Sequence, residues 1–116
     1  MRVLLAIPDT DLRLAIELAL SQEPSVTLAG AASEPAGFQA LLHTTQPDLI
    51  VLDWSLCGRE CTALMAALPH RPRVLALVRR TDEQMQALAA GADAAVSLGA
   101  PPEHLLTCFR ELRQRP

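Results

Sequence analysis

The chain has 116 residues, half of them apolar, and ten basic against thirteen acidic residues give a formal net charge of −3. This length suits one domain that buries a core without disulfides, and three cysteines favour reduced thiols and a cytoplasmic location. No basic block suggests nucleic-acid binding, no apolar run is long enough to span a membrane, and the absence of lysine excludes mechanisms that need its amine.

Five short apolar runs alternate with five amphipathic stretches, a pattern typical of repeated strand–helix units. The expected strands are 3–7, 26–29, 49–52, 74–78 and 94–97, with Gly30 ending the second. The expected helices follow 9–11, 33–35, a loop through Gly58, 81–83 and 101–102, and Gly91 closes the fourth.

Each expected helix carries an apolar stripe at helical spacing that predicts a buried face. The predicted buried residues are Leu12, Ala15, Ile16, Ala19 and Leu20; Phe38, Leu41 and Leu42; Cys61, Leu64, Met65 and Leu68; Met85, Leu88 and Ala89; and Leu105, Cys108, Phe109 and Leu112. One of Asp9, Thr10 and Asp11 is expected to cap the first helix, and the segment 81–83 to cap the fourth.

Consecutive strand–helix units form either a closed barrel or an open doubly wound sheet, and five units are too few for the barrel. The sequence therefore predicts a flavodoxin-like α/β fold, a three-layer sandwich around a parallel five-stranded sheet of order 2-1-3-4-5. Such a sheet places its site at the carboxyl ends of the first and third strands. Here the segment 7–11 and Asp53 are expected to line that crevice.

The stretch 47–53, Pro-Asp-Leu-Ile-Val-Leu-Asp, with Gly58 after it, resembles the third strand of response-regulator receiver domains. The segment 90–93, Ala-Gly-Ala-Asp, is similar to the turn before the family's fifth strand, and the resemblance covers essentially the whole chain. It implies two-component signalling, with Asp53 at the position that accepts phosphate from a histidine kinase. Residues 1–116 would form a single receiver-like domain, either the N-terminal part of a longer response regulator or a stand-alone receiver.

The family's chemistry needs more than the aspartate, because a divalent cation and a basic side chain must neutralise the charge of phosphoryl transfer. In the family an acidic pair follows the first strand, a hydroxyl residue ends the fourth, and an aromatic and a lysine lie in the fifth. The matching positions hold Ile7 and Pro8, Val78, Ala95, and Leu98 followed by Gly99. Asp53 is the one member that remains, and no cofactor is expected unless phosphorylation, with its magnesium ion, is retained.

Two charged residues near Asp53 have two interpretations each. Arg79 follows the lost hydroxyl position, where its guanidinium could pair with Asp53 and imitate a neutralised site, or it could be a solvated loop residue. Asp9 could help Asp53 hold a cation, but capping of the first helix is favoured. Neither residue establishes a metal site.

The remaining motifs favour structural roles. Cys57 and Cys61 have the spacing of half a metal site, but no second pair accompanies them, and His43, His70 and His104 are expected at the surface. No glycine-rich loop follows the first strand, which argues against a nucleotide-binding domain.

The sequence thus favours a pseudo-receiver, a non-enzymatic module that acts through protein–protein interaction or dimerisation with phosphorylation weak or lost. The alternative is a working phosphoacceptor receiver that uses Asp53. The expected partners are a sensor histidine kinase or an output domain, and a second copy could bind through the fourth helix, fifth strand and fifth helix.

Overall fold

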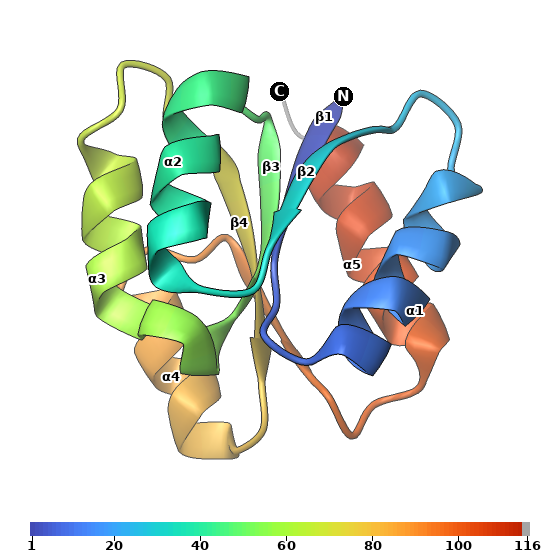
Figure 1. The fold of residues 1–116 in the computed structure, drawn as a ribbon. Helices are drawn as coiled ribbons and strands as arrows, with labels where there is room; N and C mark the ends of the chain where they lie inside the picture. Colours follow the sequence, from blue (N-terminus) through green and yellow to red (C-terminus); the bar gives the residue numbers. More distant parts are fainter. Residues whose placement is uncertain (115–116) are drawn as a thin grey trace.

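Five parallel strands form one sheet in the order β2-β1-β3-β4-β5, and five helices alternate with them along the chain (Figure 1). The computed structural model describes residues 1–114, apart from the side chains of 57–59, 61–62, 64 and 102. The strands are β1 (Arg2–Ala6), β2 (Thr27–Ala32), β3 (Leu49–Asp53), β4 (Arg73–Val78) and β5 (Ala94–Ser97). The helices are α1 (Thr10–Ser21), α2 (Pro35–Thr45), α3 (Trp54–Ala66), α4 (Thr81–Ala89) and α5 (Pro102–Gln114). The predicted fold class and strand order are confirmed.

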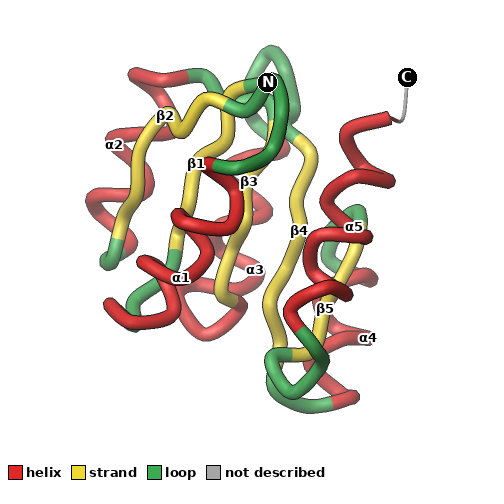
Figure 2. The backbone as a smooth tube through the Cα atoms, turned by 90° about the vertical axis from the view of Figure 1, so that its right-hand side faces the viewer, coloured by secondary structure: helices red, strands yellow, loops and turns green. Residues whose placement is uncertain are grey.

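The helices make the outer two of three layers. Helices α1 and α5 cover one face of the sheet, and α2, α3 and α4 cover the other (Figure 1). Figure 2 shows the strands side by side in the order of the sheet, with α1 and α5 in front. Each face has its own apolar cluster, and Phe109 is buried in one while Phe38 is buried in the other. Every residue of β3 is buried, as its continuous apolar run predicts for a strand covered on both sides.

The second strand does not end at Gly30, so that prediction is wrong. Gly30 lies inside β2 and pairs with Leu4, just after a register shift between Val3 and Leu4. A Cβ atom at Gly30 would lie 3.2 Å from a methyl carbon of Leu41 on α2. The glycine therefore lets α2 approach the sheet closely.

No loop separates the third strand from the third helix, which corrects the expected loop through position 58. Helix α3 begins at Trp54, directly after Asp53. The carboxylate of Asp53 accepts the Ser55 backbone N–H at 3.0 Å, and this bond satisfies a free donor of the first helical turn. The helix can therefore begin directly after the strand, because the last residue of the strand accepts a hydrogen bond from its first turn.

The fourth helix is oriented differently from the prediction. Met85 and Leu88 are 69% and 47% exposed, and Ala89 is exposed as well, whereas Ala87 is the buried residue. Ala90, just after the helix, packs on the same cluster as Ala87. Small side chains let α4 lie close to the sheet, and its larger apolar side chains face outward.

The other helical stripes follow the sequence more closely. Residues buried or half-buried as predicted are Leu12, Ile16, Ala19 and Leu20 on α1; Phe38, Leu41 and Leu42 on α2; Met65 and Leu68 on and after α3; and Leu105, Cys108, Phe109 and Leu112 on α5. Ala15 is exposed, contrary to the prediction, and the side chains of Cys61 and Leu64 lie outside the described residues. Gly91 has the predicted left-handed backbone, with a φ of 112°. No helix in the described part of the chain combines the length and apolar character of a membrane span.

Candidate functional site

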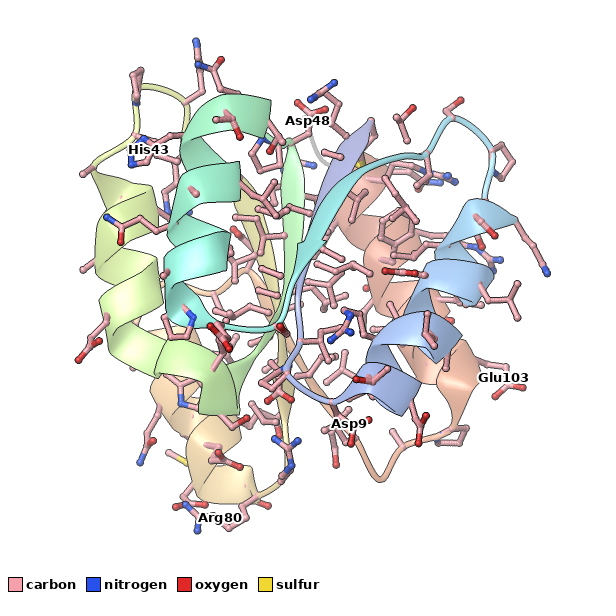
Figure 3. The ribbon with its side chains drawn as sticks, viewed as in Figure 1. Asp9, His43, Asp48, Arg80 and Glu103 are labelled. Atoms are coloured by element: carbon pink, nitrogen blue, oxygen red, sulfur yellow. The ribbon has the colours of Figure 1, made fainter. Side chains whose placement is uncertain are left out.

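The candidate site lies where the carboxyl ends of β1, β3 and β4 meet. Asp53 is the last residue of β3 and pairs in register with Leu77, two residues before Arg79. The Asp53 side chain is 1% exposed. Asp9 follows β1 at the same end of the sheet, and Figure 3 shows it at the end where Arg80 also lies. A buried carboxylate here is costly unless charged or polar partners compensate it.

Arg79 supplies that compensation through a two-point contact. Its Nη1 donates to Oδ1 of Asp53 at 2.8 Å, and its Nη2 donates to Oδ2 at 3.0 Å. This parallel arrangement is the geometry in which a guanidinium matches a carboxylate best. The pairing interpretation of Arg79 is confirmed, and the solvated-loop alternative is wrong.

Ser55 makes the second set of contacts to the buried carboxylate. Both its backbone N–H and its hydroxyl donate to Oδ1 of Asp53, at 3.0 and 2.8 Å. Oδ1 therefore accepts three hydrogen bonds and Oδ2 accepts one from Arg79. These contacts occupy both oxygens of Asp53 from within the chain.

The contacts also set the protonation state of Asp53. Burial by itself raises the pKa of this carboxyl, but the hydrogen bonds from Arg79 and Ser55 and the charge of Arg79 outweigh it, so the pKa lies below its ordinary value. The Asp53 hydrogen bonds in turn raise the pKa of Arg79 against the effect of burial, with smaller contributions from Glu83 and Asp9. The pair is therefore a fixed ion pair at neutral pH.

Glu83 fixes the backbone from which the Arg79 side chain reaches Asp53. Its Oε1 accepts the backbone N–H groups of Arg79 and Arg80, at 2.9 and 3.1 Å. Glu83 is the third residue of α4, so its side chain reaches back to cap the start of its own helix. Of the segment 81–83 that was predicted to cap α4, Glu83 makes these bonds.

The other residues predicted for the crevice have different surroundings. Asp9 caps α1, since its Oδ1 accepts the Leu12 N–H at 2.9 Å, as favoured from the sequence. Val78 is buried in the cluster beneath α2, α3 and α4, whereas Leu98 packs on the cluster beneath α1 and α5. The backbones of the two residues are joined, because the Leu98 N–H donates to the Val78 carbonyl at 2.8 Å. Only Arg79 of the four predicted pocket residues contacts Asp53.

Sequence reasoning missed the part played by Ser55, and it placed Glu83 in the cap of α4 without its bond to the backbone of Arg79. A serine two residues after a strand-terminal aspartate is a common turn pattern, and it was a usable signal. A glutamate at the third position of a helix is also a known capping signal. Neither pattern by itself assigns its residue to the site around Asp53. That assignment requires knowing that the third and fourth strands are neighbours.

The resemblance implies a magnesium ion beside Asp53, and the residues present do not fit one. A hard cation needs several free oxygen ligands, but both oxygens of Asp53 are hydrogen-bonded and Oδ1 of Asp9 caps a helix. In the part of the chain that is described, no three side chains of histidine, cysteine, aspartate or glutamate gather as metal ligands. The charge of Asp53 is neutralised by the guanidinium of Arg79 instead.

The cysteine and histidine motifs of the sequence are described only in part. The side chains of Cys57 and Cys61 lie outside the described residues. His43, His70 and His104 are exposed, as predicted. His43 lies at the opposite end of the sheet from Asp9, as Figure 3 shows.

Comparison with solved structures identifies the fold. The receiver domain of the putative response regulator NarL from Mycobacterium tuberculosis superimposes with a TM-score of 0.85 at 22% identity, covering 98% of this chain and 97% of that one. A putative response regulator from Chloroflexus aurantiacus gives 0.88 at 16% identity, with 98% of each chain covered. A LuxR-family response regulator from Aurantimonas sp. gives 0.85 at 21% identity, covering 96% of this chain and 83% of that one. The chain has the fold of response-regulator receiver domains.

The comparisons of sequence identify no relative. No family model matches it, and no curated protein matches it either. The shared fold therefore carries the structural relationship, and the function has to be argued from the residues of the site.

Proposed function

We propose that residues 1–116 form a receiver-like signalling module that acts by protein–protein contact and does not depend on phosphorylation. The observation that carries the proposal is the two-point contact between Arg79 and the buried Asp53. A phosphoacceptor aspartate must present a free oxygen to the incoming phosphorus, and a cation must neutralise the charge that develops. Here an internal guanidinium already occupies both oxygens.

The surroundings of Asp53 support the same conclusion. Leu98 stands at the position of the family's lysine and packs against the core, so this position supplies no basic side chain. Val78, at the hydroxyl position, is buried and apolar. A phosphoryl group on Asp53 would have to displace Arg79 and would lack the groups that stabilise it in the family.

The contacts of such a module are proposed for α4, β5 and α5. Met85 and Leu88 project from α4 as two of the large exposed apolar side chains. Exposed apolar side chains that lie together are suited to a partner surface. We propose that this face binds an output domain, a sensor kinase or a second copy of the chain, and that the module has no enzymatic activity.

Mass spectrometry of the intact protein tests the proposal. The wild type and Asp53→Asn are incubated with acetyl phosphate and Mg²⁺, and we expect both to keep their unmodified mass. We also expect the sedimentation coefficient to be the same with and without the phosphodonor. A stoichiometric adduct on the wild type that is missing from Asp53→Asn would establish the alternative, a working phosphoacceptor.

A further inference from the structure

A second feature lies on the other side of the sheet from α4. A pocket of about 180 Å³ opens between α1 and α5, next to the loop that joins β5 to α5. Its walls are almost entirely apolar and come from both helices, from β4 and β5 and from that loop. The lining residues used below are Leu12, Ala15, Ala19, Leu105 and Leu106.

Hydrogen bonds join the two helices beyond the pocket, near the C-terminal end of α1. Glu23, just after α1, is buried and accepts hydrogen bonds from Arg110 of α5, at 2.6 Å to Nη2 and 3.3 Å to Nε. Arg113 adds a bond of 3.0 Å to the Pro24 carbonyl. These contacts join the second half of α5 to the segment just after α1, while the pocket is lined along α1 from Leu12 to Ala19 and by Leu105 and Leu106 of α5. A pre-formed cavity requires little reorganisation when a ligand binds.

The size and chemistry of the pocket define its ligand. An apolar cavity of about 150 Å³ is large enough to hold benzene, so the volume of this pocket, which opens to solvent, suits a molecule of that size. The backbone N–H of Gly99 already donates to the hydroxyl of Ser97, a polar group of the lining, at 3.2 Å. A molecule that binds here therefore gains from burying apolar surface and finds few polar partners.

The N-termini of the two helices that line the pocket carry carboxylates. Asp11 and Glu103 lie in the first turns of α1 and α5, and Asp9 caps α1. Figure 3 shows Asp9 and Glu103 at the same end of the two helices. These carboxylates offset the partial positive charge of the helix N-termini, and the described lining of the pocket itself includes no charged residue, so an anion gains no charged partner there.

We propose that the pocket between α1 and α5 binds one small, uncharged apolar molecule of about the size of toluene. This inference does not depend on the Arg79–Asp53 pair, because the pocket is lined by other residues. The pair and the pocket can therefore be tested separately, and Asp53→Asn is expected to bind the same ligand as the wild type.

Titration of the full chain with toluene, followed through the methyl resonances of Leu12, Leu105 and Leu106, tests the proposal. We expect shifts that saturate, and no saturable shifts with benzoate. Ala15→Leu is expected to lower the affinity at least tenfold, because Ala15 is exposed at the pocket and a larger side chain there can fill it. Ala40→Leu, the same change on the exposed face of α2, is expected to bind like the wild type.

Ala19→Leu fills the pocket from a second position and is expected to lower the toluene affinity by the same factor. This second variant keeps the test valid if Ala15→Leu does not fold. Shifts that grow linearly without saturation in the wild type would overturn the proposal. So would equal affinities of the wild type, Ala15→Leu and Ala19→Leu.

Discussion

At the scale of single residues, the molecule neutralises its buried carboxylate with its own arginine. Asp53 is nearly inaccessible, whereas the Arg79 side chain is 45% exposed. The pair thus has one desolvated partner and one that still contacts water. Removing the arginine would leave a buried charge without its main partner, which is the costly way to break such a pair.

Arg79→Ala is therefore expected to lower the free energy of unfolding by about 1–3 kcal/mol, less than for a fully buried pair because Arg79 is half exposed. Urea denaturation measures the change. Arg80→Ala is the matched control, since Arg80 is 70% exposed and pairs with an exposed Asp82, so its loss should cost less than about 0.5 kcal/mol. Equal effects of the two substitutions would mean that the Arg79–Asp53 contact contributes nothing to stability.

The lowered pKa of Asp53 predicts a dependence of stability on pH. A carboxyl whose pKa is lower in the folded state binds more protons when unfolded, so its contribution is complete above the unfolded pKa. It is lost as the pH falls from there through the folded pKa. Urea denaturation of the wild type and Asp53→Asn across this acid range should show the difference in stability shrinking as the pH falls. A constant difference would contradict the lowered pKa.

At the scale of elements, α4 shows where apolar periodicity misleads. Met85 and Leu88 are spaced as a buried stripe, but the sheet beneath α4 accepts the smaller Ala87. The spacing of apolar residues cannot distinguish a stripe that faces the core from one that faces a partner. The alternation of strands and helices, by contrast, was predictable because a parallel strand covered on both faces must be apolar throughout.

Two substitutions on α4 test its orientation. Ala87→Leu should lower the free energy of unfolding by about 1–3 kcal/mol, because Ala87 is fully buried and a larger side chain overpacks the core. Met85→Ala should change it by less than about 0.5 kcal/mol, since Met85 is largely exposed. Thermal unfolding of both variants gives the comparison. A larger loss for Met85→Ala would restore the orientation expected from the sequence.

The candidate site could be predicted from the sequence in part. The strand-terminal position of Asp53 and its proximity to Arg79 followed from the topology, since β3 and β4 are neighbours in the predicted order. The contribution of Ser55 did not, because the helix starts without the expected loop. Leu98 was assigned to the crevice by alignment, yet an apolar side chain at a strand end packs into the nearest core.

At the scale of the whole molecule, the two faces of the sheet carry separate features. One side has α4 with its exposed apolar residues, and the other has the pocket between α1 and α5. Asp53 lies between them, at the carboxyl end of the central strand β3. The hydrogen bond from Arg110 to Glu23 joins α5 to the segment just after α1. The two helices that line the pocket are therefore connected although they are far apart in the sequence.

The strand order also has a consequence for how the chain reaches this structure. Strand β1 lies between β2 and β3, and the backbone N–H of Arg2 donates to Asp48, which is 46 residues further along the chain. During synthesis, one edge of β1 therefore has no neighbour until β3 leaves the ribosome. Pairings between such distant segments close long loops and form slowly. The central part of the sheet thus assembles only after nearly half of the polypeptide has been made.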